Sequence, residues 1–344
     1  MSQKTQPKVT CIVLNYNGIG IFEEALDSLK LQTYKNMEVV IADDASKDDS
    51  VKLIKKNYPW VKVLVNPKNS GTAGVSNYAV SKIGKCDYLV LMSNDMYFHK
   101  DCVKELVKTM ESDKKIGLTT AVLVKHDPDP ITKKYYIDNA GIDVDRFLFI
   151  YPHLTNQDYA TIIKDTEEIF ASCGGCYIIK PELYKEVGGF DEKYWSLSED
   201  IDMSWRIRLL GYKIMVNKKA FLYHHIHKTL KNLKMSRTRY LSERNNLMSI
   251  LKNYSNFSLL KVLPVYILLE IGEILFFLVK LRPDVSWAII RAFWHNVSNI
   301  SSTLEKRKSI QATRKIDDKK INHLMYKGSY KLDLLPGLMS ANLK

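Results

Sequence analysis

The feature that most constrains the fold is an alternation of short β-branched runs with longer amphipathic runs over the first 125 residues. The short runs span residues 9–14, 37–41, 61–65 and 88–92, and the amphipathic runs between them span 22–31, 50–58 and 73–83. Apolar residues recur at helical spacing in the longer runs, whereas turn residues bound the short ones. This alternation predicts an α/β domain in which a parallel sheet is covered by helices.

Polar residues follow the end of each predicted strand. The four loops begin Asn15-Tyr16-Asn17-Gly18, Asp43-Asp44-Ala45-Ser46, Asn66-Pro67-Lys68-Asn69 and Ser93-Asn94-Asp95. Such residues are common in any turn. Because the carboxyl ends of parallel strands meet at one edge of a sheet, where ligands bind in α/β folds, four polar loops together predict a nucleotide-binding edge.

Two sets of side chains in these loops have different expected roles. Asp43 can accept hydrogen bonds from a base or ribose, and amide contacts can come from Asn15, Asn69 and Asn77. Helix capping is the better explanation for the acidic and hydroxyl groups that precede a helix starting near Ser50. This second set is Asp44, Ser46 and Asp48.

A candidate cation site combines Asp95 with one histidine. Asp95 directly follows the run 88–92, where its carboxylate could share Mg²⁺ or Mn²⁺ with phosphate oxygens, although a lone Asp after a strand is usually a turn residue. An imidazole cluster, His224-His225-x-His227, follows another strand-like run at 213–223. We expect only one of these histidines to be a ligand.

Three carboxylates open a predicted helix over residues 199–210, namely Glu199, Asp200 and Asp202. Acidic residues at a helix N-terminus stabilise it by about 0.3–1 kcal/mol each, which is a structural explanation for them. Three exceed what capping requires, so one is a candidate base for an acceptor hydroxyl. Trp195, just ahead, offers an aromatic face on which a sugar can stack.

Paired glycines interrupt the apolar run 169–179 and predict that another group approaches the backbone there. The flanking Cys173 and Cys176 have the spacing of half a zinc site, but no second pair completes it. Five cysteines without a framework spacing fit reduced thiols. The polar N-terminus shows no secretion signal, so we expect a cytoplasmic protein.

Beyond residue 234 the pattern becomes helical, and the run 259–281 is long and apolar enough to span a bilayer. Glu270 and Glu273 would fall near its centre at a cost of several kcal/mol. We therefore expect helices in the membrane interface, anchored by Trp287 and Trp294, with burial against the core as the second alternative and a true transmembrane span as the third. The net charge of +13, concentrated late in the chain, fits an anionic surface or substrate.

Six segments, in order, resemble glycosyltransferase family 2, whose catalytic domain has the GT-A fold. They are VTCIVLNYNG at 9–18, VVIADDASKDDS at 39–50, NPKNSGTAGVSNYAV at 66–80, YLVLMSND at 88–95, GGFDEKYWSLSEDIDMSWRIRLLGYK at 188–213 and AFLYHH at 220–225. The resemblance implies a GT-A type mixed sheet flanked by helices in residues 1–235. A helical, basic, membrane-associating region would follow in residues 236–344.

The resemblance also implies residue roles. Asp200, beside Glu199, matches the family's catalytic base, Asp43 its nucleotide-contacting Asp, Asp95 the last Asp of its Asp-x-Asp metal motif and His224 the histidine completing that site. The remaining candidates are Asn15, Tyr16, Asn69, Gly71, Asn77 and Asn94 for the nucleotide, and Trp195 and Asp202 for the acceptor. Ser93 stands where the first Asp of the metal motif would be, as in relatives similar to rhamnosyltransferases, which also lack that Asp.

The predicted function is an inverting glycosyltransferase that moves a hexosyl or deoxyhexosyl group from a nucleotide-diphosphate donor to a hydroxyl. The tail is similar to that of members which build envelope polysaccharide on polyprenyl-linked acceptors, so a saccharide or lipid-linked acceptor at the inner membrane face is expected, without nucleic acid. A sugar nucleotidyltransferase is an alternative that predicts a Gly-rich loop after the first strand. A non-catalytic membrane- or nucleic-acid-binding protein leaves Glu199, Asp200 and His224 unexplained.

Overall fold

The computed structural model describes residues 6–162, 164–225 and 235–333. The chain divides into two compact units. The first comprises residues 1–141, 152–207 and 212–231, and the second comprises 142–151, 208–211 and 232–344. The expected division between 235 and 236 stays a prediction, and the structure adds that the short segment 142–151 packs with the helical unit.

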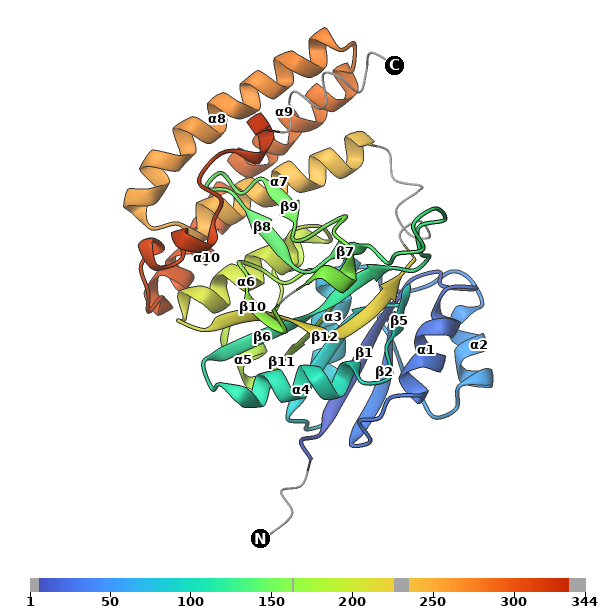
Figure 1. Ribbon diagram of the computed structural model, residues 1–344. Helices are drawn as coiled ribbons and strands as arrows, with labels where there is room; N and C mark the ends of the chain where they lie inside the picture. The colour runs from blue at the N-terminus through green and yellow to red at the C-terminus, as the bar shows by residue number, and fades with distance from the viewer. Residues whose placement is uncertain (1–5, 163, 226–234, 334–344) are drawn as a thin grey trace. The chain divides into compact units, whose positions relative to one another are not determined.

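A mixed sheet forms the centre of the first unit (Figure 1). Over the described residues its main path runs β10-β12-β6-β11-β4-β1-β2-β3, and β5 and β7 pair with β12 and β6. Neighbours are parallel from β3 to β4, whereas β11 is antiparallel to both β4 and β6. The strands are β1 Val9–Asn15, β2 Met37–Asp43, β3 Lys62–Val65, β4 Tyr88–Ser93, β5 Met96–Phe98, β6 Ile116–Lys125, β7 Ile137–Asn139, β10 Thr166–Glu168, β11 Cys176–Ile179 and β12 Lys213–His224.

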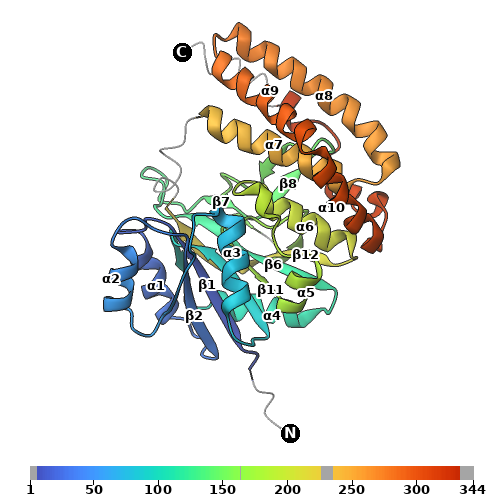
Figure 2. The same cartoon turned by 180° about the vertical axis from the view of Figure 1, so that it is seen from behind.

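Helices lie on both faces of this sheet, with α3 and α4 on opposite sides (Figures 1 and 2). Their apolar residues recur at helical spacing and are buried, as Phe22, Leu26 and Leu29 are in α1. The helices are α1 Phe22–Lys30, α2 Ser50–Asn57, α3 Gly71–Lys82, α4 Cys102–Ser112, α5 Pro181–Glu186 and α6 Glu199–Leu209. The predicted α/β class is therefore confirmed, and the antiparallel β11 makes the sheet mixed.

The polar loops emerge at one edge of the sheet, as the sequence predicts. In the parallel ladders Asn15 pairs with Asp43, and Asp43 pairs with Val65. The end of β4 is level with them, because Leu14 pairs with Ser93. The loops that follow β1, β2, β3 and β4 thus start side by side.

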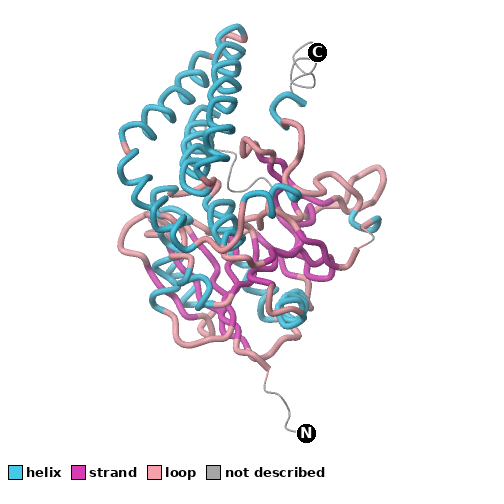
Figure 3. The backbone as a smooth tube through the Cα atoms, turned by 90° about the vertical axis from the view of Figure 1, so that its left-hand side faces the viewer, coloured by secondary structure: helices cyan, strands magenta, loops and turns pink. Residues whose placement is uncertain are grey.

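The second unit is built from helices that run side by side (Figure 3). Helix α7 packs against α9 and α10, and α8 packs against α9. The elements are α7 Met235–Asn253, α8 Asn256–Val279, α9 Pro283–Ser298 and α10 Ile300–Thr313, with a two-stranded sheet of β8 Ile142–Val144 and β9 Ile150–Pro152. The segment 142–151 is tied to this unit by the Tyr254 hydroxyl, which donates to the Arg146 carbonyl over 2.7 Å.

Helix α8 carries its two glutamates on the inner side of this unit, whereas its Lys261 is exposed. Glu270 is fully buried and forms an ion pair with Lys331, and Glu273 forms ion pairs with Lys331 and Arg239. Elsewhere α8 is apolar, and only 17% of its most apolar window is buried. The helix is long and apolar enough to cross a membrane by length and composition alone.

Candidate active site

Hydrogen bonds between side chains join the ends of β1, β2 and β4. The Asn15 amide donates to Asp43 Oδ1 over 2.8 Å, and its oxygen accepts from the Asn94 amide over 2.9 Å. Asp43 Oδ2 also accepts from the Ser46 backbone N–H over 2.9 Å. A Cβ on Gly18 would meet Asn15 Oδ1 at 2.0 Å, so the loop passes over this cluster only with glycine.

This cluster places Asn15, Asp43 and Asn94 together at the predicted nucleotide edge, but below its surface. Asp43 is fully buried, and Asn15 and Asn94 are almost fully buried. Tyr16, directly after Asn15, is 47% exposed. The cluster is therefore a rigid base for the loops, and the exposed aromatic ring beside it is open to a ligand.

Asp44 caps α3 rather than α2. Its carboxylate accepts from the backbone N–H groups of Ser70 and Gly71, both within 2.9 Å, and from the Asn66 amide. The expectation that Asp44 caps the helix near Ser50 is therefore wrong, because the β3–α3 turn brings the α3 N-terminus onto this carboxylate. Asp48 does bond to the Ser50 N–H, over 3.1 Å.

Gly71 has a packing reason that sequence reasoning missed. Its φ is +70°, and a Cβ there would lie 2.2 Å from the Trp195 carbonyl oxygen. That same oxygen accepts from the Ala73 N–H over 3.2 Å. Gly71 thus lets the α3 N-terminus hold the backbone of Trp195, and Asn69, exposed in the same turn, donates to the Asp44 carbonyl.

Two side chains that are predicted to contact a ligand have partners within the protein. The Asn77 amide bonds to the Phe190 backbone through both its nitrogen and its oxygen, and also accepts from the Tyr184 hydroxyl. Asp202 is fully buried and pairs with Arg206 at 2.9 Å. Either side chain could turn toward a ligand only by breaking these bonds, so a ligand role for Asn77 and Asp202 stays a prediction.

The segment before α6 has an unusual backbone. Trp195, Leu197 and Ser198 all have positive φ, at 62°, 71° and 63°. For residues other than glycine this conformation costs on the order of 1–3 kcal/mol each and persists where the surroundings enforce it, often at active sites. Here it delivers Glu199 and Asp200 at the start of α6, next to a half-buried Trp195.

Asp200 lies against the paired glycines before β11. The Gly174 N–H donates to the Asp200 carboxylate. A Cβ on Gly174 would lie 3.2 Å from Asp200 Oδ2, so the expected close approach is confirmed. Gly174 therefore positions the Asp200 carboxylate with its backbone N–H, and the absence of a side chain allows the close approach.

Burial raises the pKa values of both acids at this helix start. The pKa of Glu199 rises to about 8 because its side chain is desolvated, and the neighbouring Asp200 carboxylate adds to the rise. Burial also raises the pKa of Asp200, but bonds from the Ile201 and Gly174 N–H groups oppose it and hold the value to about 6. Asp200 is thus the acid of the pair that ionises first, and a base poised near neutrality suits proton abstraction.

Asp200 and Asp95 lie at the same edge of the sheet. β11 pairs antiparallel with β4, and the Ser93 N–H donates to the Gly175 carbonyl over 3.1 Å. Gly174, which holds Asp200, is therefore next to the end of β4, and Asp95 follows that end by two residues. The predicted base and the predicted cation ligand thus flank the end of one strand.

His224 lies between two carboxylates. Its Nε2 is 3.6 Å from Asp95 Oδ2, and its Nδ1 is 2.7 Å from Asp138 Oδ2. The pairing of Met96 in β5 with His224 in β12 brings Asp95 beside the imidazole. Burial alone would lower the pKa of His224, but the Asp138 and Asp95 carboxylates outweigh it and raise the value to about 9.

The Asp95–His224 pair fits a divalent cation. The two ligand atoms are too far apart for a good hydrogen bond, and the other imidazole nitrogen is held by a carboxylate, as metal-ligating histidines usually are. Asp138 was missed from sequence because it lies in the weakly patterned stretch before residue 165. Its position becomes defined once β7 pairs with β6.

Asp138→Asn is expected to weaken activation by Mn²⁺ by about 10–100-fold, the usual effect of losing a carboxylate that supports a ligating histidine. The carboxylate orients the His224 imidazole and raises its basicity, and a neutral amide cannot do both. A Mn²⁺ titration of the predicted sugar-transfer activity measures the change. Asp113→Asn, which changes a half-buried Asp before β6 that pairs with Lys213, is the matched control, and equal titration curves for both variants would remove Asp138 from this role.

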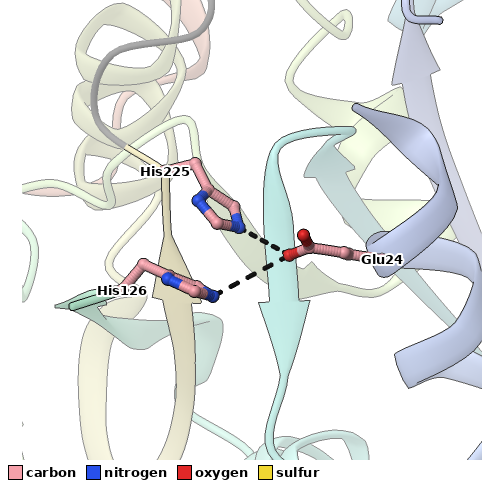
Figure 4. A group of neighbouring side chains, drawn as sticks. All are labelled: Glu24, His126 and His225. Carbon is pink, nitrogen blue, oxygen red and sulfur yellow. Dashed lines mark hydrogen bonds and ion pairs between the residues drawn. The ribbon is translucent and has the colours of Figure 1, made fainter. Parts of the chain in front are cut away.

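The other histidines have different positions. The His225 imidazole contacts Glu24 (Figure 4), and the His225 backbone N–H donates to the Asp95 carbonyl over 3.3 Å. His227 lies outside the described residues. Cys173 and Cys176 are buried free thiols, and burial raises the pKa of Cys173 to about 11. Burial therefore disfavours the thiolate that a zinc site requires.

Comparison with known proteins identifies the family and the fold of this chain. Residues 10–188, more than half of the chain, match the family described as Glycosyl transferase family 2. The poly-beta-1,6-N-acetyl-D-glucosamine synthase of Staphylococcus aureus is 23% identical over 268 residues, covering 76% of this chain and 60% of the relative. The O-antigen chain rhamnosyltransferase WbaN of Salmonella anatum is 24% identical over 220 residues, covering 63% of this chain and 66% of the relative. The chain thus spans about 60% of the length of the Staphylococcus relative.

Two solved structures share the fold. GalNAc-T7 in complex with UDP, GalNAc and Mn²⁺ superposes with a TM-score of 0.60 at 17% identity, over 74% of this chain and 49% of its own. The mannosyltransferase PcManGT from Pyrobaculum calidifontis in complex with GDP-Man and Mn²⁺ superposes with a TM-score of 0.53 at 16% identity, over 90% of this chain and 86% of its own. The fold of the first unit is that of GT-A enzymes, and the chain belongs to glycosyl transferase family 2.

Proposed function

We propose that the chain is an inverting glycosyltransferase that transfers a sugar from a nucleoside-diphosphate donor to an acceptor hydroxyl. The observation that supports this most strongly is the position of Asp200. It is held by the Gly174 N–H at the edge where β4 ends and Asp95 follows. With a base on one side of this strand end and a diphosphate site on the other, the donor sugar would lie between them, as a single displacement requires.

Asp200 is the base in this mechanism. Its carboxylate accepts the proton of the acceptor hydroxyl while the hydroxyl oxygen forms a bond to the anomeric carbon of the donor. The bond from that carbon to the diphosphate oxygen breaks, and the nucleoside diphosphate leaves with the electron pair. The attack comes from the face opposite the leaving group, so the configuration inverts. Glu199, with the higher pKa, stays protonated beside Asp200 and limits the local negative charge.

Asp95 and His224 are the residues that would hold a divalent cation, Mg²⁺ or Mn²⁺. Such an ion supplies positive charge to the departing diphosphate. His224 must be neutral to bind it, and Asp138 keeps the imidazole oriented through Nδ1. Both structural neighbours are described with Mn²⁺, which supports this assignment.

The donor and acceptor sides follow from the loops. Asn69 and the exposed ring of Tyr16 flank the nucleotide edge, with Asn15, Asp43 and Asn94 as its rigid base. Gly71 places Trp195, whose ring is the proposed platform for the acceptor sugar. PcManGT is described with GDP-Man and GalNAc-T7 with UDP, which supports a nucleotide-sugar donor.

The acceptor we propose is a saccharide or lipid-linked saccharide of envelope polysaccharide synthesis, reached from the cytoplasmic membrane face. The names of the Staphylococcus and Salmonella relatives support this class of product. The apolar side of α8 and α9 supports a peripheral membrane position, because large apolar side chains are exposed along both helices. They include Phe257, Leu260, Leu268, Leu275, Trp287 and Trp294.

A panel of nucleotide sugars, scored for release of the free nucleoside diphosphate with and without a chelator, tests the proposed activity. We expect one nucleotide sugar to give release that depends on an added saccharide acceptor and on Mg²⁺ or Mn²⁺. Product NMR then reports the anomeric configuration. A retained configuration would overturn the inverting mechanism, and transfer of a nucleotidyl group would overturn the transferase assignment itself.

The double variant Leu268→Glu, Leu275→Glu is expected to lose most binding to vesicles containing anionic lipid. Both side chains are exposed, at 67% and 57%, so charges there leave the helical packing intact but forbid burial in acyl chains. Flotation of vesicles at low and high salt measures the loss. Ile131→Glu, an 89% exposed isoleucine in the first unit, is the matched control. Equal flotation of all three proteins would discard the membrane contact.

A further inference from the structure

Glu24, His126 and His225 gather at the surface of the first unit from three separate elements (Figure 4). Glu24 lies in the first turn of α1, His126 directly follows β6, and His225 directly follows β12. Their ligand atoms all lie within 4.8 Å of one another. The mechanism proposed above uses none of the three.

The backbone fixes the two histidines side by side. β6 and β12 are parallel neighbours in which Lys125 pairs with His224. The His126 N–H donates to the His224 carbonyl over 3.2 Å, and the imidazoles of His126 and His225 stack with centroids 3.7 Å apart. The pairing of β6 with β12 therefore fixes the backbone positions of His126 and His225 next to each other.

Both imidazoles direct Nε2 at one carboxylate oxygen. Nε2 of His225 is 2.5 Å from Glu24 Oε2, and Nε2 of His126 is 3.8 Å from the same atom. In a tetrahedral zinc site the ligand atoms are about 3.3 Å apart, so these two distances bracket the required spacing. His126 Nδ1 lies 3.1 Å from Asp127 Oδ1, an outer carboxylate of the kind that orients a metal-ligating imidazole.

We propose that Glu24, His126 and His225 form a second divalent-cation site that is selective for Zn²⁺-class ions. Two imidazoles and one carboxylate favour Zn²⁺ over the hard cations Mg²⁺ and Mn²⁺, which prefer oxygen. Side-chain exposures of 48% for Glu24, 35% for His126 and 18% for His225 leave the remaining coordination position to water. A bound ion would tie α1 to the ends of β6 and β12, where His225 directly follows His224 and its N–H donates to the Asp95 carbonyl over 3.3 Å.

This inference does not depend on the proposed sugar transfer, so it is tested by binding alone. The protein is the full chain carrying Asp95→Asn and His224→Ala, which removes the catalytic cation site. After treatment with a chelator it is titrated with Co²⁺, followed by visible d–d absorption, and with Zn²⁺ in a calorimeter. We expect one equivalent of tight binding and a Tm that rises by roughly 5 °C when the free ion is at about 100 times its Kd.

Adding Glu24→Gln and His126→Ala to this protein is expected to weaken Zn²⁺ binding by more than about 10-fold and to abolish the Tm shift. His323→Ala, which removes an exposed histidine of the second unit, is the control and should bind as tightly as the parent. If the parent takes up no Zn²⁺, the cluster is a histidine–carboxylate ion pair and the proposal is overturned. Unchanged binding in the Glu24→Gln, His126→Ala protein overturns it equally, because the ion is then held elsewhere. Circular dichroism of each variant shows that the fold is intact.

Discussion

The Asp200→Asn variant is expected to bind the nucleotide sugar as the wild type does and to turn it over roughly 10²–10⁴-fold more slowly, the typical contribution of general-base catalysis. The amide can still accept the Gly174 N–H bond, so the start of α6 should keep its geometry. It cannot accept the acceptor proton. Calorimetry with the donor gives binding, and single-turnover transfer gives the rate of the chemical step.

The pH profile gives an independent check of the same residue. With the pKa of Asp200 near 6, wild-type kcat/KM should rise as pH increases through that value and then level off as the carboxylate becomes ionised. Asp200→Asn should lose this rise. Asp191→Asn changes the half-buried Asp that caps the short helix at Glu192–Tyr194, and it should keep both rate and profile because an amide oxygen can still accept the Lys193 N–H bond. A wild-type rate in Asp200→Asn would remove Asp200 from catalysis.

Stability should change in the opposite direction to activity. Asp200 has a folded-state pKa above its unfolded value, so folding becomes less favourable as pH rises from about 4 to about 6, where the native state must give up a proton from a buried site. Asp200→Asn removes that ionisation. Its Tm should exceed that of the wild type above pH 6 and match it at pH 4. Active sites commonly reduce stability in this way.

The central sheet could be predicted from sequence because its signal is local. The runs at 9–14, 37–41 and 88–92 are bounded by turns and separated by amphipathic stretches, and each became a strand that extends one or two residues further. The direction of β11 was not predictable in this way. An apolar run of four residues fits a parallel or an antiparallel strand equally well. Only the pairing of β11 with β4 and β6 shows that it is antiparallel to both.

The positions of individual site residues were harder to predict, since sequence spacing does not show which partner a polar group will find. Asp44 and Asp48 look alike as caps, yet the turn after β3 brings the N-terminus of α3 onto the Asp44 carboxylate. Asp138 and Glu24 carry no local signal at all. Each becomes a partner of a histidine only after β6 and β12 align their ends.

Replacing the proposed cation ligands is expected to have the second-largest effect. Asp95→Asn and His224→Ala should each lower kcat by about 10²–10³-fold, the usual effect of losing a group that stabilises charge on a leaving oxygen. Both side chains would bind the same ion, since Asp95 Oδ2 and His224 Nε2 lie 3.6 Å apart. The fold-decrease in kcat of the double variant should therefore be close to that of either single variant. It should be far smaller than the product of the two single fold-decreases.

A cation titration separates this mechanism from a purely structural effect. If Asp95 and His224 hold the ion, saturating Mn²⁺ should restore part of the activity of each single variant, because one ligand and the donor diphosphate still bind it. No concentration of Mn²⁺ should rescue the double variant. Multiplied losses, together with rates that do not respond to Mn²⁺ or a chelator, would mean that the two residues act separately and that positive charge reaches the diphosphate from the protein itself. In that case protonated His224 would itself stabilise the leaving group. The replacement of the first Asp of the metal motif by Ser93 would then fit an enzyme that works without the cation.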